Sequence, residues 1–190
     1  MSSFNKGILY IVIGSFWWGV VGVIYFRSLS FVGSIELVLH RVVWTSLMLI
    51  VTIFYLSKWN KLKKIIKSKE NIFYLGITGV LIFVNWSVWI YAVSTNQIVD
   101  ASFGYFIMPI LSVLFGYIFF KEILNKLRVF SIILTFFSVV YLFYFYKNFP
   151  WIGLTVGLSW SLYNVFRKKI DVEVDLGLLI ESLLILPFAL

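Results

Sequence analysis

Long apolar stretches separated by short polar linkers restrict the possible folds of this chain more than any other feature. An α-helix needs about 20 mostly apolar residues to cross a bilayer. Six such stretches are present, over residues 7–26, 33–57, 72–93, 99–120, 129–146 and 151–166. A seventh starts near Leu176 and is still apolar at Leu190, the last residue. We therefore expect an all-α, polytopic membrane protein whose short linkers make neighbouring helices antiparallel.

The composition leaves too few charged side chains to cover a water-facing surface. The 190 residues are 62% hydrophobic and 13% charged, with a mean hydropathy of +1.00. About a quarter of a soluble globular chain is charged. This excludes a soluble domain and makes lipid the solvent that suits the side chains.

Several kinds of chemistry are missing from the sequence. There is no cysteine, and His40 is the single histidine, which excludes disulfides, thiolate metal sites and clusters of histidine ligands. No phosphate-binding glycine loop and no set of nucleophile, base and acid appears. We therefore expect no metal, no cofactor, no catalytic residue and no enzyme activity.

Lysine and arginine gather in alternate linkers and indicate an orientation. All but three of the 16 basic residues lie at the N-terminus or in the linkers after the second, fourth and sixth stretches, the exceptions being Arg27, Arg41 and Lys147. Cytoplasmic loops collect such residues, so we expect a multi-pass plasma-membrane protein with a cytoplasmic N-terminus. The Lys-rich linker 58–69 is interpreted as a topology signal, with recognition of lipid headgroups or nucleic acid as the alternative.

Two short patterns recur at nearly the same offset along the chain. The first and sixth stretches share Gly-x-x-Trp, ending at Trp17 and Trp160, which are 143 residues apart. The second and seventh share Ile-Glu, ending at Glu36 and Glu181, which are 145 residues apart. The matched helices are five apart, an odd number, so they cross the membrane in opposite directions. This is typical of the inverted repeats of transporters.

The repeat predicts how the chain is divided. Residues 1–148 are expected to form a first repeat of five transmembrane helices. Residues 149–190 are expected to begin a second repeat with the sixth helix and part of the seventh. A complete protein would then have ten helices and roughly 290 residues, and this chain would be a truncated fragment of it.

Small residues at a spacing of four mark the sixth stretch, at Gly153, Gly157 and Ser161. Such residues let transmembrane helices approach closely. We expect them to serve packing inside the protein, with an oligomer contact as the less favoured use.

Ionisable residues cluster where the second and fourth stretches begin. Polar side chains in a membrane are costly and are candidates for function. Glu36 and His40 are four apart and share a helix face, and Arg41 lies about 25 Å from the cytoplasmic end of its helix at 1.5 Å per residue. We expect Glu36, His40, Arg41 and Asp100 to form an outer gate or ion pair, Arg41 pairing with Asp100 or Glu36. Snorkelling to headgroups, or a purely structural bridge, is the alternative.

Aromatic and amide side chains fall near the middle of several stretches, although tryptophan usually lies at the membrane interfaces. They suit an amphipathic cavity, because flat faces stack on a solute and a few donors orient it. The expected substrate-binding residues are Trp17, Asn85, Trp86, Tyr105 and Trp160. Pro109 removes a helical hydrogen bond and is the expected hinge. Tight helix packing with lipid-facing aromatics is the alternative.

Several runs together are similar to one known family. They are Leu39-His40-Arg41-Val42-Val43-Trp44, Asn85-Trp86, Ala101-Ser102-Phe103-Gly104-Tyr105-Phe106-Ile107-Met108-Pro109, Val165-Phe166-Arg167-Lys168-Lys169-Ile170 and Ile180-Glu181. They resemble the RarD group of chloramphenicol-sensitive proteins in the EamA family, within the drug/metabolite transporter superfamily. The resemblance covers essentially the whole chain. It implies ten helices in two inverted five-helix repeats, an inner-membrane location and small-molecule permease activity.

The sequence therefore predicts a secondary transporter that moves a small organic metabolite or drug by alternating access. The expected partners are the solute and the lipid bilayer, with a second copy of the chain as a homodimer through the small-residue stripe. No nucleic acid is expected. The alternative is a non-transporting membrane scaffold, or a half-transporter subunit that must pair with another chain.

Overall fold

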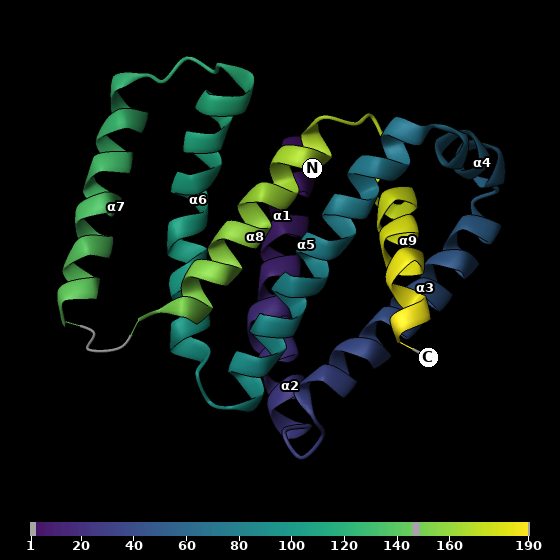
Figure 1. Cartoon of the computed structure of the whole chain (residues 1–190), viewed down its shortest axis with the longest axis horizontal. Helices are drawn as coiled ribbons and strands as arrows, with labels where there is room; N and C mark the ends of the chain where they lie inside the picture. Colours follow the sequence, from purple (N-terminus) through teal and green to yellow (C-terminus); the bar gives the residue numbers. More distant parts are fainter. Residues whose placement is uncertain (1–2, 146–148, 190) are drawn as a thin grey trace.

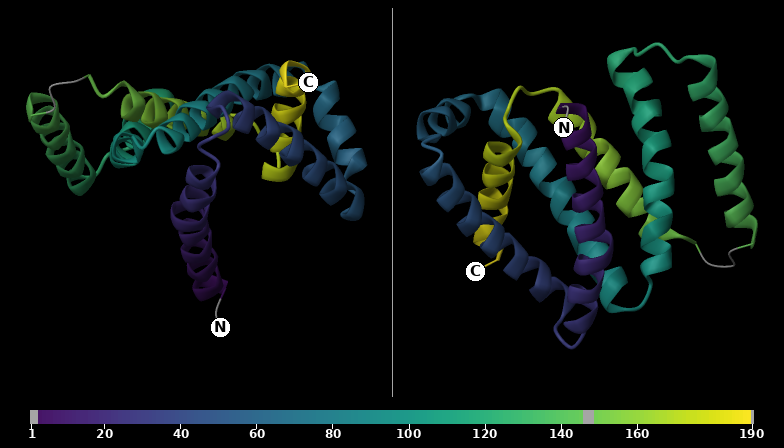
Figure 2. Two further views of the ribbon diagram at one scale, coloured as in Figure 1. Left: turned by 90° about the horizontal axis from the view of Figure 1, so that it is seen from below. Right: turned by 180° about the vertical axis from the view of Figure 1, so that it is seen from behind.

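The computed structural model describes residues 3–145 and 149–189. Across these residues the chain forms helices joined by turns and loops, and none of them lies in a strand. The expected all-α fold class is confirmed. Figures 1 and 2 show most of the helices side by side in one curved layer, with α1 projecting from it.

The helices coincide with the predicted stretches to within a few residues. The first span is continuous through α1 (Ser3–Phe16), the π-helical segment η1 (Trp17–Gly22) and α2 (Val23–Ser28). The others are α3 (Ser34–Tyr55), α5 (Lys69–Ser94), α6 (Ile98–Phe120), α7 (Lys126–Phe145), α8 (Trp151–Lys168) and α9 (Val174–Ile185), followed by the short 3₁₀ turn η2 (Leu186–Phe188). The predicted end of the fifth stretch at Tyr146, the nearby Lys147 and Leu190 fall outside the described residues.

Four helices in the described part of the chain are long and apolar enough to cross a membrane. They are Phe4–Ser28, Ser34–Tyr55, Lys69–Ser94 and Ile98–Phe120. Their length suits a bilayer, since 20 residues of helix span about 30 Å. These spans support an integral membrane protein.

The Lys-rich linker contains a helix, α4 (Trp59–Lys67). Leu62 and Ile65 are three apart and are 5% and 9% exposed, so they form a short buried stripe. The lysines between and beside them stay exposed. The lysine content obscured this stripe, which is the amphipathic pattern of a surface helix. Ser68 then begins α5 by accepting a hydrogen bond from the Asn71 backbone N–H at 3.3 Å, a helix N-cap.

The basic linkers lie at one end of the layer. In Figure 1 the α3–α5 connection with α4, the α6–α7 loop and the α8–α9 loop are all at the top, whereas the α5–α6 loop is at the bottom. We name this end of the molecule the Lys-rich end. The arrangement agrees with the alternation of charged linkers along the sequence.

Helix α8 packs between α5 and α6 rather than against α7, its neighbour in sequence, and its contact with α6 is made through glycines. A Cβ atom on Gly104 of α6 would lie 2.6 Å from the Gly153 carbonyl oxygen, and one on Gly153 would lie 2.7 Å from the Asp100 carbonyl oxygen. Ser161 donates a hydrogen bond to the Met108 carbonyl oxygen at 3.2 Å. The predicted use of the small-residue stripe for internal packing is confirmed. These backbones approach as closely as small residues allow.

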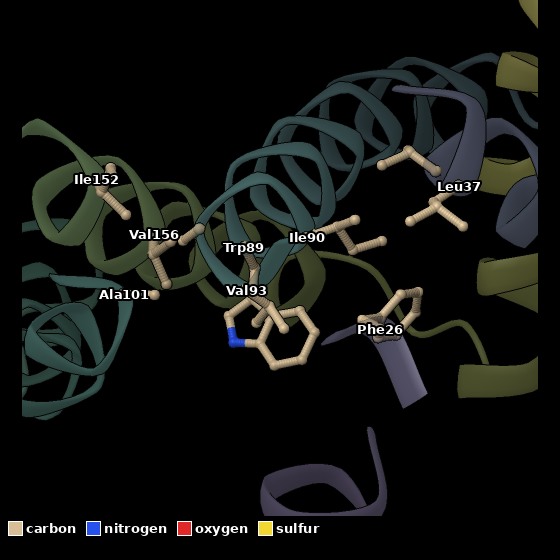
Figure 3. Packing of buried hydrophobic residues seen from close by; sticks show 10 residues of the cluster. Phe26, Leu37, Trp89, Ile90, Val93, Ala101, Ile152 and Val156 are labelled. Atoms are coloured by element: carbon tan, nitrogen blue, oxygen red, sulfur yellow. The ribbon is translucent and has the colours of Figure 1, made fainter. Parts of the chain in front are cut away.

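One buried apolar cluster joins α2, α3, α5, α6 and α8. Figure 3 shows its labelled members: Phe26, Leu37, Trp89, Ile90, Val93, Ala101, Ile152 and Val156. In contrast, the large apolar side chains of α1 and α7 are largely exposed, as Phe4 (74%) and Phe136 (61%) illustrate. In a bilayer such faces meet lipid.

Candidate functional site

The side chain of Arg41, on the third turn of α3, lies against aromatic rings. Its guanidinium carbon is 4.0 Å from the centre of the Trp86 ring, 4.6 Å from that of Trp18 and 6.0 Å from that of Phe26. We name Arg41 with Trp18, Phe26 and Trp86 the aromatic cage. A cation over such rings is stabilised by about 0.5–1 kcal/mol when exposed and about 2 kcal/mol when desolvated. The cage therefore offsets part of the cost of removing the guanidinium from water.

Contacts among four elements, η1, α2, α5 and α6, hold the rings of the cage in place. Trp18 comes from η1 and stacks on Trp89 of α5 with ring centres 4.6 Å apart. Its indole Nε1 donates a hydrogen bond to the Tyr105 hydroxyl of α6 at 3.2 Å. Phe26 of α2 meets the Trp89 ring edge-on at 5.7 Å. Stacked and edge-on pairs are the favoured arrangements of aromatic rings, so the cage is held from several sides.

Two open cavities meet at Arg41. The larger, of about 490 Å³, is lined in part by Glu36, His40, Arg41 and Trp44. The smaller, of about 340 Å³, is lined in part by Trp17, Trp18 and Arg41. Pockets that bind small molecules have volumes of about 300–1,000 Å³, and here both expose one cation among apolar and aromatic walls.

The structure brings some of the predicted substrate-binding residues together and separates others. Trp86 belongs to the cage, and Tyr105 supports it through Trp18. Trp17 lines the smaller cavity, but its side chain is 65% exposed. The ring that lies against Arg41 belongs to the next residue, Trp18.

The other two predicted substrate-binding residues lie toward α8. The Asn85 amide donates to the Val156 carbonyl oxygen and to Ser159 Oγ, both at 3.0 Å. It is 5% exposed and joins α5 to α8. The Trp160 ring stacks on Tyr163 at 5.4 Å and packs against the buried cluster that holds Trp86.

Three of the four predicted gate residues lie together. Glu36, His40 and Arg41 all line the larger cavity. Glu36 lies 3.9 Å from His40 Nε2, and both side chains are about two-thirds exposed, at 64% and 65%. Asp100 is in the first turn of α6 and half-buried. The predicted hinge residue Pro109 lies inside α6, which continues through it from Ile98 to Phe120.

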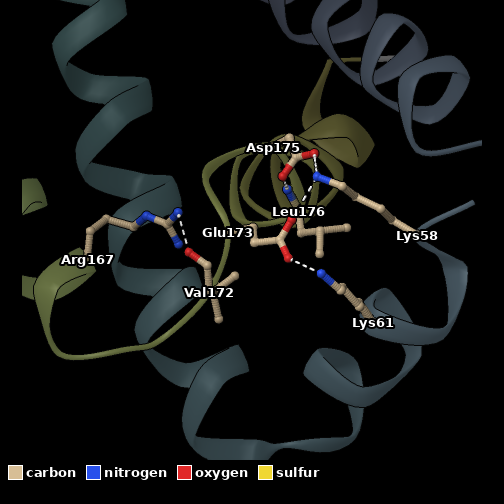
Figure 4. Close-up of polar contacts among 7 residues, drawn as sticks. All are labelled: Lys58, Lys61, Arg167, Val172, Glu173, Asp175 and Leu176. Atoms are coloured by element: carbon tan, nitrogen blue, oxygen red, sulfur yellow. Dashed lines mark hydrogen bonds and ion pairs between the residues drawn. The ribbon is translucent and has the colours of Figure 1, made fainter. Parts of the chain in front are cut away.

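A second polar group ties α9 to the segment around α4 at the Lys-rich end. Lys58 Nζ lies 2.5 Å from an Asp175 oxygen and 2.7 Å from a Glu173 oxygen, and Lys61 Nζ lies 2.5 Å from the other Glu173 oxygen. Figure 4 shows both lysines pointing at these carboxylates. We name Lys58, Lys61, Glu173 and Asp175 the ion-pair cluster.

Ion pairing shifts the pKa values of Glu173, Lys58 and Glu122. Hydrogen bonds from Lys58 and then Lys61 lower the pKa of Glu173 to about 2. Hydrogen bonds to Asp175 and then Glu173 raise the pKa of Lys58 above its ordinary value. A hydrogen bond from Lys168 of α8 likewise lowers the pKa of Glu122, just beyond α6. The charged forms of these side chains are therefore the favoured ones.

Sequence reasoning did not place Trp18 or Glu181 in a site. Both had a signal, since Trp18 is the other half of a mid-helix Trp pair and the predicted repeat pairs Glu181 with Glu36. Their surroundings differ, however, because Glu181 is 0% exposed and the Glu36 side chain is 64% exposed.

The fold and the cage together define a class of protein: a polytopic, α-helical integral membrane protein with a caged cation beside open cavities. The chain belongs to the EamA-like transporter family, which matches residues 5–144. The resemblance to the RarD group expected from the sequence motifs is also confirmed, as follows.

Curated relatives carry RarD and transporter names. Protein RarD of Escherichia coli (strain K12) is 33% identical over 185 residues, which cover 97% of this chain and 62% of the relative. The transporter YojE of Bacillus subtilis (strain 168) is 29% identical over 189 residues, covering 98% and 63%. The chloramphenicol-sensitive protein RarD of Pseudomonas aeruginosa is 26% identical over 170 residues, covering 87% and 57%. The chain thus spans less than two-thirds of these relatives' length. No solved structure matches the chain.

Proposed function

We propose that the chain belongs to a secondary transporter that moves a small organic metabolite or drug across the plasma membrane by alternating access, and that it is not an enzyme. The observation that carries the proposal is the Arg41 guanidinium, held between Trp86 and Trp18 where two cavities open. Intramembrane cations beside a cavity mark substrate or ion pathways. The family membership supports the same class of function.

The chemistry of the cage favours one kind of solute. Flat rings stack on flat solutes, and the guanidinium attracts a carboxylate or another anionic group. We infer an amphipathic solute with an aromatic or planar part and an acidic or strongly polar group. Trp17, Trp86, Tyr105 and Trp160 would line its path, with Trp18 added from the geometry, and Asn85 would hold α5 to α8 behind them.

The moving parts are assigned as follows. Glu36, His40, Arg41 and Asp100 form the outer gate, Pro109 is the hinge in α6, and the ion-pair cluster closes the opposite, cytoplasmic side. The N-terminus is cytoplasmic. Residues 1–148 act as the first inverted repeat, and residues 149–190 begin the second. A second copy of the chain, as a homodimer, or the remaining part of a longer protein supplies the opposing helices.

Uptake into vesicles tests this proposal. Inverted membrane vesicles from cells that express the chain are incubated with radiolabelled aromatic acids, aromatic amino acids and chloramphenicol, the compound in the name of the Pseudomonas aeruginosa relative. At least one compound should accumulate above the level in vesicles without the chain. If none accumulates while the chain is inserted and self-associates, the non-transporting alternative holds.

Trp86→Ala makes the test specific to the cage. The substitution removes a cation–π contact worth about 1–2 kcal/mol, so uptake should fall about ten-fold. Trp86→Phe keeps a ring under Arg41 and should retain most of the uptake, and Trp59→Ala on α4 is the matched control. An unchanged rate and an unchanged range of solutes in Trp86→Ala would remove this residue from the site.

A further inference from the structure

Glu181 on α9 is a completely buried carboxylate that lies outside the cage and the two cavities described above. It is 0% exposed. The Thr78 hydroxyl of α5 donates to its Oε1 at 2.7 Å, and the Tyr163 hydroxyl of α8 donates to its Oε2 at 3.3 Å. A carboxylate away from water is costly unless it is paired and hydrogen-bonded. Inside membrane proteins such residues mark ion paths and proton relays.

The cation that faces this carboxylate is close to it, but the Nε–Oε1 pair of the two groups is not a hydrogen bond. Arg167 Nε lies 3.7 Å from Glu181 Oε1, which is too long for a hydrogen bond. Arg167 Nη2 donates weakly to the Val172 carbonyl oxygen at 3.4 Å, as Figure 4 shows. Its buried Nη1 makes no hydrogen bond within the described residues. The site therefore contains a carboxylate and a guanidinium that attract each other without a fixed bidentate pair.

The face of α9 is shaped to hold this guanidinium. A Cβ atom on Gly177 would lie 2.2 Å from Arg167 Nη1, so a larger residue there would displace the guanidinium. Gly177 and Glu181 are four apart and share a helix face. The Arg167 head group thus lies along α9 between the Val172 carbonyl and the carboxylate, where a small movement changes the charge that Glu181 meets.

Each element packed on α9 contributes a defined set of groups. Helix α8 presents Tyr163 and Arg167, and α5 presents Thr78 and Tyr74, the latter packed against the buried cluster that includes α9. On α3 the ionisable side chains Glu36, His40 and Arg41 line the cavities, Tyr55 is 85% exposed, and the buried polar residue is Ser46. The turn η2 carries no ionisable residue.

Tyr163 connects Glu181 to the aromatic cage. Its hydroxyl bonds Glu181, its ring stacks on Trp160 at 5.4 Å, and it shares a buried cluster with Trp86. Trp86 in turn lies under Arg41 at 4.0 Å. A change at Glu181 can therefore reach the cavity walls through this shared cluster of side chains.

We propose that Glu181 is the proton-binding residue through which transport couples to a pH gradient, a proposal that rests on the transport function above. On one side of the membrane the carboxylate takes a proton from hydronium: an O–H bond of hydronium breaks, leaving water, and the O–H bond of the carboxylic acid forms. The negative charge that attracts Arg167 is then lost. On the other side that O–H bond breaks, the proton returns to water, and the ionised carboxylate attracts Arg167 again. Glu181 is occluded in the present conformation, and movement of α9 along α5 and α8 would expose it to each side in turn.

Infrared spectroscopy of the chain in lipid tests proton binding without any solute. Acidification should produce a carbonyl stretching band of a protonated carboxylic acid, with one component missing from Glu181→Gln and kept in Glu122→Gln, an exposed carboxylate control. Thr78→Val removes a donor to the carboxylate and should shift that component to higher pH, which gives a second readout if Glu181→Gln folds poorly. Identical spectra for the parent and a folded Glu181→Gln at every pH would overturn the proposal.

Vesicle uptake then tests coupling, using the probe compound that the parent chain accumulates. An imposed pH gradient should change the uptake rate in the parent and in Glu122→Gln, with this dependence lost in Glu181→Gln. Equal uptake by the parent with and without the gradient would overturn the coupling. The two proposals can fail separately. The infrared component of Glu181 without any uptake would support the proton site and contradict transport. Uptake without that component would support transport and contradict the proton site.

Discussion

At the scale of single residues, the most consequential arrangement is the packing of the Arg41 guanidinium against the aromatic rings of Trp18 and Trp86. A carboxylate that neutralised Arg41 would leave little attraction for an incoming solute. Indole faces stabilise the guanidinium through their quadrupole, and they leave its net charge intact. The larger cavity, of about 490 Å³, opens beside this charge.

The ion-pair cluster has a pH dependence whose sign follows from the two shifted pKa values. The pKa of Glu173 is lowered from 4.5 to about 2, so its contribution to stability is complete above 4.5 and is lost as the pH falls through about 2. The pKa of Lys58 is raised from 10.5, so its contribution is complete below 10.5 and is lost only above that value. Glu173→Gln should therefore lower the melting temperature by a constant amount between pH 4.5 and 10.5.

Thermal unfolding of the chain in detergent over this range measures the effect. Lys67→Met, which removes an exposed charge of α4, is the control and should melt as the parent does at each pH. A difference between Glu173→Gln and the parent that grows or vanishes near neutral pH would contradict the assignment of the cluster.

At the scale of elements, the contact between α6 and α8 depends on a missing side chain. Gly104→Ala would place a methyl group 2.6 Å from the Gly153 carbonyl oxygen, so the helices must move apart. Overpacking of this kind costs about 1–3 kcal/mol. We expect a lower melting temperature and faster exchange of the backbone amides in α6 and α8 near this contact, which thermal unfolding and amide exchange would detect.

Gly76→Ala supplies the matched comparison, because a Cβ atom at Gly76 of α5 meets nothing within 4 Å. Alanine is favoured over glycine inside a helix by about 0.5–1 kcal/mol, so this variant should be as stable as the parent or slightly more so. Equal melting temperatures for Gly104→Ala and Gly76→Ala would mean that the close approach is not rigid.

The sequence predicts the existence and type of these helices better than it predicts which side of each helix packs against its neighbours. Long apolar runs determine the spans, since each helix satisfies its own backbone hydrogen bonds in lipid. A helix that is apolar all round has no periodic stripe to orient it, which is why the sequence does not distinguish Trp17 from Trp18. The partner of Asn85 depends on α8 packing against α5, and that contact joins residues 71 positions apart.

The candidate site illustrates the same division between local and long-range information. Charge and position single out Arg41, Glu36 and His40, and the structure places these three together. Glu181 and the ion-pair cluster need contacts far along the chain, for example 117 positions between Lys58 and Asp175. No local pattern predicts those pairs.

At the scale of the whole molecule, the placement of the basic linkers at one end gives a direct test of orientation. The chain has no cysteine, so single introduced cysteines report their own exposure. Lys64→Cys and Lys126→Cys should react with a membrane-impermeant maleimide in inverted vesicles but not in intact cells. Asn96→Cys, in the α5–α6 loop, should react in intact cells. The opposite pattern would reverse the proposed orientation, and labelling of all three from one side would contradict the helix count between them.

The wide turn η1 (Trp17–Gly22) has a geometric consequence for the first span. A π turn holds about one residue more than an α turn, and each residue of an α-helix advances the azimuth by about 100° at 3.6 residues per turn. Deleting one residue there would shorten the helix by only about 1.5 Å, but it would rotate Ser3 to Phe16 by about 100° about the helix axis relative to α2. The π segment therefore determines which side of α1 faces Arg41, and it has little effect on how far α1 extends from the layer.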